Sequence, residues 1–462
     1  MSCLWDSIAP SGATISGEFH GRGASVALEE LAAGSTFGAA ALESLRGRSV
    51  LIATHEQLPA ALALVELDGV ARRMVLCTPD LTPEQLAGVA ATAQADAIVW
   101  EAASATSAPG SLAPHVVTPR PVPGLIERRA SLATEWILLT SGTTGAPKLV
   151  VHTLQSLGGA LPTQTRSGPQ SIWSTFYDIR RYGGLQIYLR AVLSGSPLVL
   201  SSSGEQTPDF LARAAVAGVT HISGTPSHWR RALMSGQAAI LKPEYVRLSG
   251  EVADQAVLDN LRAVYPTARI AHAFASTEAG VAFDVNDGLA GFPVALVDHP
   301  TGGIELKVVD HTLRIRSGRN AARYLGAAPG VLVSDDGYVD TGDMVELVDG
   351  RYYFRGRVGG VINVGGLKVY PEEVESVLNA DPRVRMSLVR ARRNPITGAV
   401  VVADVVLANP ASPAASDSPD AVKSDLLDAC RRNLTAHKVP ALLRFVPVLE
   451  FTPAGKLVQP DT

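Results

Sequence analysis

Residues 140–148 read TSGTTGAPK, a run of small hydroxyl and glycine residues that ends in a proline and a lysine. Glycines let successive backbone N–H groups converge on one anion, hydroxyls add donors, and a lysine supplies positive charge. The composition therefore suits phosphate binding. The Walker A pattern, Gly-x-x-x-x-Gly-Lys-Ser/Thr, is absent from the chain, so this is a different kind of phosphate loop. A plain turn after a buried strand is the alternative.

The string resembles the phosphate-loop signature of the adenylate-forming superfamily, which contains acyl- and aryl-CoA synthetases, nonribosomal peptide adenylation domains and luciferases. Four further stretches resemble later motifs of that family and follow in its order, so the resemblance spans roughly residues 136–457. It implies ATP as a substrate and Lys148 near the β- and γ-phosphates. It also implies nucleotide contacts for Thr140, Ser141, Gly142, Thr143, Thr144 and Gly145.

Residues 274–280, FASTEAG, resemble the family's aromatic-Gly-x-Thr-Glu segment, with Ala275 where glycine is usual. The resemblance implies that Thr277, beside Ser276, contacts the α-phosphate and that Glu278 helps to hold Mg²⁺. A hard cation takes carboxylate and phosphate oxygens, which suits this assignment. Standing alone, a Thr-Glu pair would instead suggest a helix cap.

Residues 336–347, DGYVDTGDMVEL, resemble the family's Tyr-x-x-Thr-Gly-Asp motif. Asp343 suits a ribose, because a carboxylate accepts hydrogen bonds from both hydroxyls of a diol; an Asx turn is the alternative. Residues 354–375 resemble the domain-junction motif and imply a nucleotide contact for Arg357. The tetrad PAGK ends in Lys456, which matches the family's C-terminal catalytic lysine and would otherwise be read as a solvated charge.

Residues 174–186, STFYDIRRYGGLQ, bear on the acid substrate. Tyr177-Asp178 resembles the aromatic-Asp pair with which amino-acid adenylation domains bind the substrate's amino group. A carboxylate beside an acyl pocket needs a partner, and Asp178 either pairs internally with Arg180 or Arg181 or receives an amine or hydroxyl of the substrate. Further pocket walls are expected from Ser249, Gly250, Phe274 and Ala275. Such walls favour a compact, flat acid, so we predict a small aryl acid ahead of a long fatty acid.

The sequence predicts that the helices and strands that position these residues form α/β layers. Short apolar stretches at 49–54, 197–202 and 220–224 predict buried strands, while 63–72 and 254–265 predict helices. Residues 102–124 and 408–420, rich in Ala, Ser and Pro, predict surface connections.

A glycine-rich stretch that begins near residue 356 predicts three units: a large core (1–355), a hinge (356–360) and a small mobile α+β domain (361–462). A helix is expected from Pro371, followed by a strand, a turn at Asn394-Pro395 and a second strand. Gly359 replaces the charged hinge residue of many relatives, which leaves rotation possible but removes a contact.

Composition narrows the class of protein. With 46% hydrophobic and 18% charged residues and a net charge of −4, the chain reads as soluble, with no basic excess for nucleic acid or an anionic membrane. Three scattered cysteines lack metal or redox spacing, and no basic leader or long apolar run is seen, so we expect a cytoplasmic protein.

Three functions are weighed. The favoured one is an AMP-forming ligase that activates a carboxylic acid and then passes on the acyl group. The acceptor would be CoA or the phosphopantetheine of a carrier protein acting in trans. A stand-alone enzyme that adenylates an amino acid or an amino-substituted acid is a variant of this function. A P-loop kinase or ATPase would release ADP instead of AMP, and the missing Walker motif argues against it. A catalytically silent nucleotide-binding relative would need damage at Lys456, Glu278 or Asp343, and all three are present.

Overall fold

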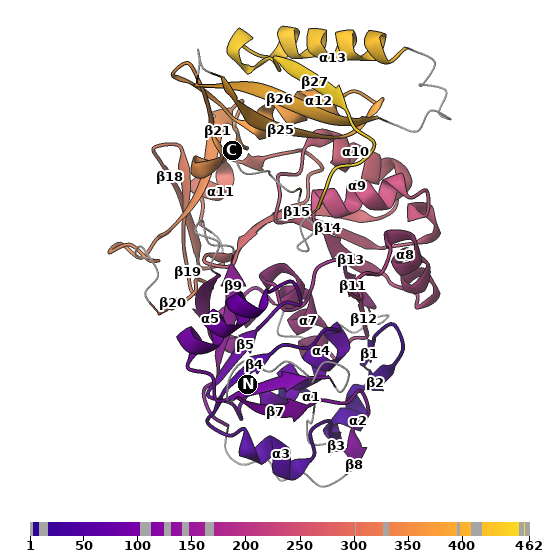
Figure 1. Ribbon diagram of the computed structural model, residues 1–462, viewed down its shortest axis with the longest axis vertical. Helices are drawn as coiled ribbons and strands as arrows, with labels where there is room; N and C mark the ends of the chain where they lie inside the picture. Colours follow the sequence, from indigo (N-terminus) through magenta and orange to yellow (C-terminus); the bar gives the residue numbers. More distant parts are fainter. Residues whose placement is uncertain are drawn as a thin grey trace.

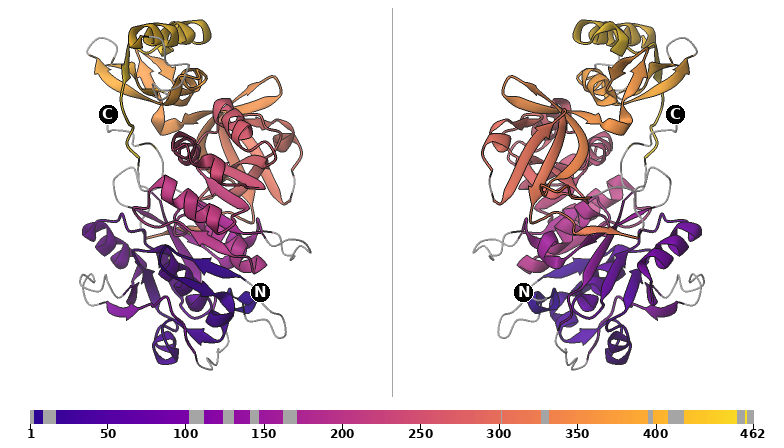
Figure 2. Two further views of the ribbon diagram at one scale, coloured as in Figure 1. Left: turned by 90° about the vertical axis from the view of Figure 1, so that its right-hand side faces the viewer. Right: turned by 90° about the vertical axis from the view of Figure 1, so that its left-hand side faces the viewer.

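The computed structural model describes residues 3–8, 17–101, 112–123, 131–140, 147–161, 171–300, 302–326, 332–394, 398–407, 418–451 and 457. In these ranges the chain forms a large N-terminal part of layered sheets and helices and a smaller C-terminal part at one end of the molecule (Figures 1 and 2). No helix in them is both long and apolar enough to cross a bilayer.

One sheet runs in the order β20-β10-β9-β5-β4-β6-β7. The strands from β9 to β7 are parallel to one another, whereas β10 pairs antiparallel with both β9 and β20. Its strands are β4 (Ser49–Ile52), β5 (Arg73–Leu76), β6 (Ala97–Trp100), β7 (Ala113–Val116), β9 (Glu135–Thr140), β10 (Lys148–His152) and β20 (Arg323–Leu325). Helices α3 (Ala39–Ser44), α4 (Gln57–Leu67) and α5 (Pro83–Ala93) accompany it. Strands β4, β5 and β6 are buried throughout and mostly apolar, as expected for a sheet covered on both faces.

A second sheet runs β16-β15-β14-β13-β11-β12-β1-β2 and is parallel from β15 to β1. Its strands are β1 (Glu18–His20), β2 (Ser25–Ala27), β11 (Trp173–Thr175), β12 (Leu198–Leu200), β13 (His221–Gly224), β14 (Tyr245–Ser249), β15 (Arg269–Ser276) and β16 (Gly280–Val285). The helices of this region are α1 (Trp5–Ile8), α2 (Leu28–Ala32), α6 (Leu154–Gly158), α7 (Tyr182–Ser194), α8 (Thr207–Val216), α9 (Pro226–Met234) and α10 (Gln255–Val264). Buried side chains of both sheets, α4 and α7 form the largest hydrophobic core.

A third, antiparallel sheet continues the large part in the order β17-β22-β21-β19-β18. It contains β17 (Phe292–Pro293), β18 (Ile304–Val309), β19 (Thr312–Ser317), β21 (Val339–Val348) and β22 (Arg351–Arg357), with the short helix α11 (Ala295–Asp298). A minor sheet pairs β3 (Gly34–Ser35) with β8 (Val122–Pro123).

The C-terminal part has its own core, made by residues between Ile362 and Leu443. It contains β23 (Ile362–Val364), β24 (Leu367–Val369), α12 (Pro371–Asn379), β25 (Val384–Asn394), β26 (Gly398–Leu407), α13 (Pro419–Asn433) and β27 (Leu442–Phe445). A short 3₁₀ turn, Val358–Gly360, joins it to β22. Gly359 lies in this turn, exposed and with open space where a Cβ would stand, while its role as a hinge stays a prediction.

The α/β class and most expected elements are confirmed, and two expectations are wrong in detail. The helix predicted over 63–72 ends at Leu67, because Gly69 adopts a positive φ of 84° and a Cβ there would meet Cys3 at 2.8 Å. The connection expected at 102–124 contains β7, since Ala113–Val116 pairs with the edge of β6. Cys3, Cys77 and Cys430 are buried and free.

Candidate active site

The predicted phosphate loop joins two paired strands. Thr140 ends β9, Lys148 begins β10, and the two residues face each other in the antiparallel ladder. The residues between them that we assigned to phosphate binding (Ser141, Gly142, Thr143, Thr144 and Gly145) lie outside the described residues. The Thr140 hydroxyl is buried without a hydrogen-bond partner in the described part of the chain. A buried orphan hydroxyl at the rim of this loop fits a site that receives a polar ligand.

The Thr277-Glu278 pair sits in the turn between β15 and β16. Ser276 Oγ accepts a hydrogen bond from Ala279 N at 2.9 Å, which fixes the turn. Gly280 has a φ of 73°, and a Cβ there would come within 2.6 Å of a backbone oxygen of Arg319. The final glycine of FASTEAG is therefore required by the close approach of two backbones.

A histidine that sequence analysis did not single out supports this turn. His152 Nε2 lies 2.7 Å from the Thr277 carbonyl oxygen, and Nδ1 lies 3.0 Å from Ser156 Oγ. Because a carbonyl only accepts, Nε2 carries the proton and Nδ1 accepts from the serine. Burial lowers the pKa of His152 to about 4, so the ring is neutral at physiological pH. His152 thus ties the strand after the phosphate loop to the Thr277-Glu278 turn.

Tyr324 on β20 is a second residue that sequence analysis missed. Lys148 Nζ lies 5.6 Å from the centroid of its ring, and the Glu278 carboxylate is close enough to influence the pKa of its hydroxyl. Burial and the charge of Glu278 raise the pKa of Tyr324, while nearby Arg357 opposes this rise. Lys148 therefore lies near this ring, and the charges of Glu278 and Arg357, which come from two other motifs, act on the pKa of its hydroxyl.

Asp343 and Arg357 face each other across β21 and β22. Arg357 Nε lies 3.2 Å from Asp343 Oδ1, and Arg357 Nη2 donates to the Thr341 carbonyl at 2.9 Å. The Arg357 side chain is 65% exposed, whereas that of Asp343 is 19% exposed. The two predicted nucleotide contacts are therefore neighbours, with the carboxylate held in place and the guanidinium reaching into solvent.

The pocket residues divide into two groups. The buried Tyr177 hydroxyl donates to the Ser249 carbonyl at 2.7 Å and lies 3.0 Å from its Oγ, while Gly250 follows with a φ of 85°. Phe274 stacks on Phe354 at 5.2 Å in the core of the third sheet, with Ala275 next in the strand. The structure therefore brings Tyr177 and Ser249 into contact, and it places Phe274 against the neighbouring core.

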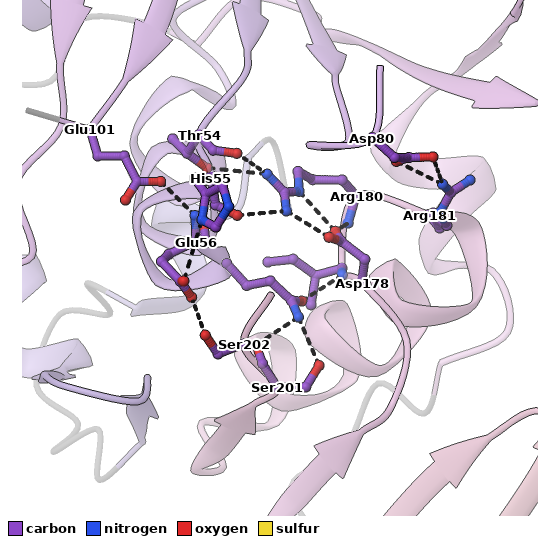
Figure 3. A network of polar contacts seen from close by, with 12 residues as sticks. Thr54, His55, Glu56, Asp80, Glu101, Asp178, Arg180, Arg181, Ser201 and Ser202 are labelled. Atoms are coloured by element: carbon purple, nitrogen blue, oxygen red, sulfur yellow. Dashed lines mark hydrogen bonds and ion pairs between the residues drawn. The ribbon is translucent and has the colours of Figure 1, made fainter. Parts of the chain in front are cut away.

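Asp178 has the internal partner that we weighed. Arg180 donates to Asp178 from its backbone N and Nε, both at 2.8 Å to Oδ1, and from Nη2 at 2.6 Å to Oδ2 (Figure 3). Arg180 also reaches the carbonyls of Thr54 and His55, whereas Arg181 pairs with Asp80. Burial alone would raise the pKa of Asp178, but Arg180 outweighs it and holds that pKa below its usual range. The structure thus supports the structural role of Asp178 and gives no support to an amine contact.

Helix α9 connects the acyl side of this site to the C-terminal part. The His228 ring, in its first turn, stacks on Phe176 at 5.5 Å and meets the Tyr177 ring edge-on at 5.7 Å. Burial and the nearby Arg231 charge lower the pKa of His228 to about 3, so it is neutral. The ring that meets Tyr177 is therefore aromatic and neutral, which sequence analysis did not identify, while the charges of Arg247 and Glu251 also act on the pKa of Tyr177.

Lys456 lies outside the described residues, so its catalytic role stays a prediction. Phe451 and Leu457, on either side of the PAGK tetrad, form an isolated antiparallel bridge. In the described residues no group of three His, Cys, Asp or Glu side chains could hold a metal. Glu278 as a Mg²⁺ ligand would therefore act together with phosphate oxygens, which is how this cation is usually bound beside nucleotides.

Comparisons with known family models match a large N-terminal region and a smaller C-terminal region separately. A family model described as AMP-binding enzyme matches residues 19–320, and one described as AMP-binding enzyme C-terminal domain matches residues 373–456. The first match begins far upstream of the motifs, so the similarity extends into the first 130 residues.

Among curated proteins, a 2-succinylbenzoate–CoA ligase of Salmonella typhimurium is 31% identical over 54% of this chain and 53% of its own length. The chain thus spans about half the length of this relative. A fatty acid–[acyl-carrier-protein] ligase of Mycobacterium marinum is 25% identical over 70% of this chain and 66% of its own. Among solved structures, the anthranilate CoA ligase AuaEII in complex with anthranoyl-AMP superposes with a TM-score of 0.80 at 17% identity, covering 98% of this chain and 95% of that one. This last likeness shows the same fold.

Proposed function

Because the chain belongs to the AMP-binding enzyme family, we propose that it uses ATP to activate a carboxylic acid as an acyl-adenylate and then transfers the acyl group to a thiol. The observation that carries the proposal is the pairing of Asp343 with Arg357 at 3.2 Å, together with Lys148 beside the Tyr324 ring, on whose pKa the charges of Glu278 and Arg357 both act. These side chains are far apart in the sequence, and they supply the cation, the metal-binding carboxylate and the diol acceptor that a nucleotide would need. No single motif would require this arrangement.

The chemistry has two steps. In the first, a carboxylate oxygen of the acid attacks the α-phosphorus of ATP, the bond to the bridging oxygen breaks, and pyrophosphate leaves. In the second, a thiolate attacks the acyl carbon and AMP leaves with the electron pair of the acyl–oxygen bond. Charge neutralisation matters more than covalent assistance in the first step. We assign that task to Lys456 and Lys148, with the Thr277 hydroxyl donating a hydrogen bond to the α-phosphate.

The remaining nucleotide contacts orient the substrate. The Asp343 carboxylate is the acceptor for the ribose hydroxyls, and Arg357 holds that carboxylate while reaching toward the nucleotide. Mg²⁺, bound by Glu278 and phosphate oxygens, would supply charge neutralisation at the phosphates. The Glu278 carboxylate lies close enough to Tyr324 to raise the pKa of its hydroxyl, and His152 fixes the backbone of the turn that carries Glu278. A preorganised turn is what electrostatic stabilisation requires.

We propose a small aryl acid as the substrate. The lining next to Tyr177 consists of the ring of Phe176 and the neutral ring of His228, which suit a flat apolar body. Relatives named for 2-succinylbenzoate and anthranilate agree with an aryl class. Since both oxygens of Asp178 are engaged by Arg180, an amino substituent would need a different partner.

The acceptor is proposed to be CoA, as for the succinylbenzoate ligase relative. A carrier protein is the second candidate, because the relative from Mycobacterium marinum is named for transfer to an acyl carrier protein. Pyrophosphate exchange against a panel of aryl, fatty and amino acids identifies the acid, and the best acid is then tested with CoA and with a carrier. An enzyme that releases ADP, or that exchanges pyrophosphate with no acid in the panel, would refute the proposal.

A further inference from the structure

A cation–π contact joins helix α9 of the large part to the last segment of the chain. The Arg231 guanidinium carbon lies 4.4 Å from the ring centroid of Phe451. In Figure 1 the yellow end of the chain descends from the C-terminal part beside α9. Arg231 is therefore covered by a residue that lies five positions before Lys456.

The surroundings make this contact specific. Arg231 Nε is buried with no hydrogen-bond partner in the described residues, so the aromatic face is a main compensation for its lost hydration. Phe451 and Leu457 pack with Met234, at the end of α9, in a small cluster completed by C-terminal side chains. Arg385 Nη1 on β25 reaches the Met234 carbonyl at 3.5 Å. The end of α9 is thus one place where the two parts of the molecule meet, and the hydrogen bond from Asn379 Nδ2 to Asp254 Oδ2 at 3.3 Å marks another.

The same helix also borders the acyl side of the site. His228 contacts Phe176 and Tyr177, and Arg231 follows it by three residues, on the same face of a helix. The carboxylate of Glu251, two residues after Ser249, accepts a hydrogen bond from Ser227 N at 2.9 Å at the start of α9. Trp229 is fully buried and anchors the helix. A rigid helix thus spans the distance from the acyl pocket to Phe451.

We propose that Arg231 is a positioning residue for acyl-adenylate formation, which holds the segment before Lys456 against α9 by stacking on Phe451. The inference rests on the proposed function, since it assigns Lys456 to the first step. The contact joins residues of two parts, so it exists only while they are docked, and it shifts the equilibrium toward the docked arrangement. When the parts separate, the guanidinium regains its hydration and the stacking is lost.

The test separates the two half-reactions. Arg231→Gln and Phe451→Leu are each expected to lower the rate of acid-dependent ATP–pyrophosphate exchange about 3- to 10-fold, the range of one cation–π contact. The Phe451→Leu change keeps an apolar side chain in the cluster. Thioester formation from supplied acyl-adenylate and pantetheine should be unchanged, and Arg231→Lys should retain most of the exchange rate. The double variant should be no slower than either single variant, because both remove the same contact.

Arg269→Gln is the matched control. Arg269 stacks on Tyr245 at the same 4.4 Å, but within the second sheet, so its loss should leave exchange unchanged. Equal loss of both half-reactions, additive effects of the two substitutions, or an equal loss in the control would overturn the proposal.

If the wild type shows no exchange with any acid, the proposed function fails but the contact is still testable. Trypsin cleavage after Arg357, in the segment that joins the two parts, should then be faster in Phe451→Leu than in the wild type. An unchanged cleavage rate would overturn the docking role of the contact.

Discussion

At the residue scale, Asp343 offers the most direct test of nucleotide recognition. Replacing it by alanine removes the proposed acceptor for the ribose hydroxyls and should raise the KM for ATP by ~10-fold or more, since hydrogen bonds to charged groups contribute about 1.5–3 kcal/mol. Glu346→Ala, on the same strand but paired with Arg355 at 2.8 Å, is the control and should leave the KM unchanged. An unchanged KM in Asp343→Ala would mean that the ribose is held elsewhere.

His152 makes a prediction about pH. Its folded-state pKa of about 4 lies below the ordinary value of 6.5, so protons bind the unfolded state more readily and stability is lost as pH falls from 6.5 toward 4. Linkage gives a loss of ~2 kcal/mol from this residue at pH 5 relative to pH 7.5. Denaturant unfolding at both pH values should show this extra loss in the wild type and not in His152→Asn. The same pH dependence in both proteins would contradict a buried neutral histidine.

Through their resemblance to family motifs, the sequence strings around Thr277, Glu278, Asp343 and Arg357 predicted nucleotide roles for these four residues. They could not locate His152 or Tyr324. A histidine at the end of an apolar strand or a tyrosine on a short edge strand looks like an ordinary structural residue. Their roles come from contacts with residues distant in sequence, such as the Thr277 carbonyl and the Glu278 carboxylate, and only the folded structure supplies those contacts.

At the element scale, the loop after β11 is held by Asp178 and Arg180 against the start of α4 (Figure 3). Asp178→Asn should lower stability by ~3 kcal/mol or more, because it leaves a buried guanidinium without its counter-ion. The relative exchange rates for benzoate and 2-aminobenzoate should not change. Asp80→Asn, which frees the more exposed Arg181, should cost less than about 1 kcal/mol. A selective loss of 2-aminobenzoate activity in Asp178→Asn would restore the amine-binding interpretation.

The sequence left the choice between these two roles of Asp178 open for a physical reason. Arg180 and Arg181 lie two and three residues after Asp178, and either could pair with the carboxylate. The backbone directs Arg180 inward, where it is 1% exposed, and Arg181 outward to Asp80. The direction of each side chain is set by the loop conformation, and no local pattern specifies it.

At the scale of the whole molecule, we assign Lys456 to the first half-reaction alone. Lys456→Ala should lower acyl-adenylate formation by ~100-fold or more, because its charge is needed where the transition state develops charge. Thioester formation from supplied acyl-adenylate should be spared. Lys438→Ala, a C-terminal lysine paired with Glu373 at 2.7 Å, is the control and should affect neither step. Equal loss of both steps in Lys456→Ala would refute the assigned role.

The central claim is that this chain activates a carboxylic acid by adenylation. It is tested most directly by ATP–pyrophosphate exchange with benzoate, 2-aminobenzoate, 4-hydroxybenzoate and a C12 fatty acid, followed by product analysis with CoA. We predict pyrophosphate exchange that depends on an aryl acid and is slower with the C12 acid. When CoA is added, the products should be AMP and an acyl thioester. Release of ADP, or no acid-dependent exchange with any of the four, would contradict it.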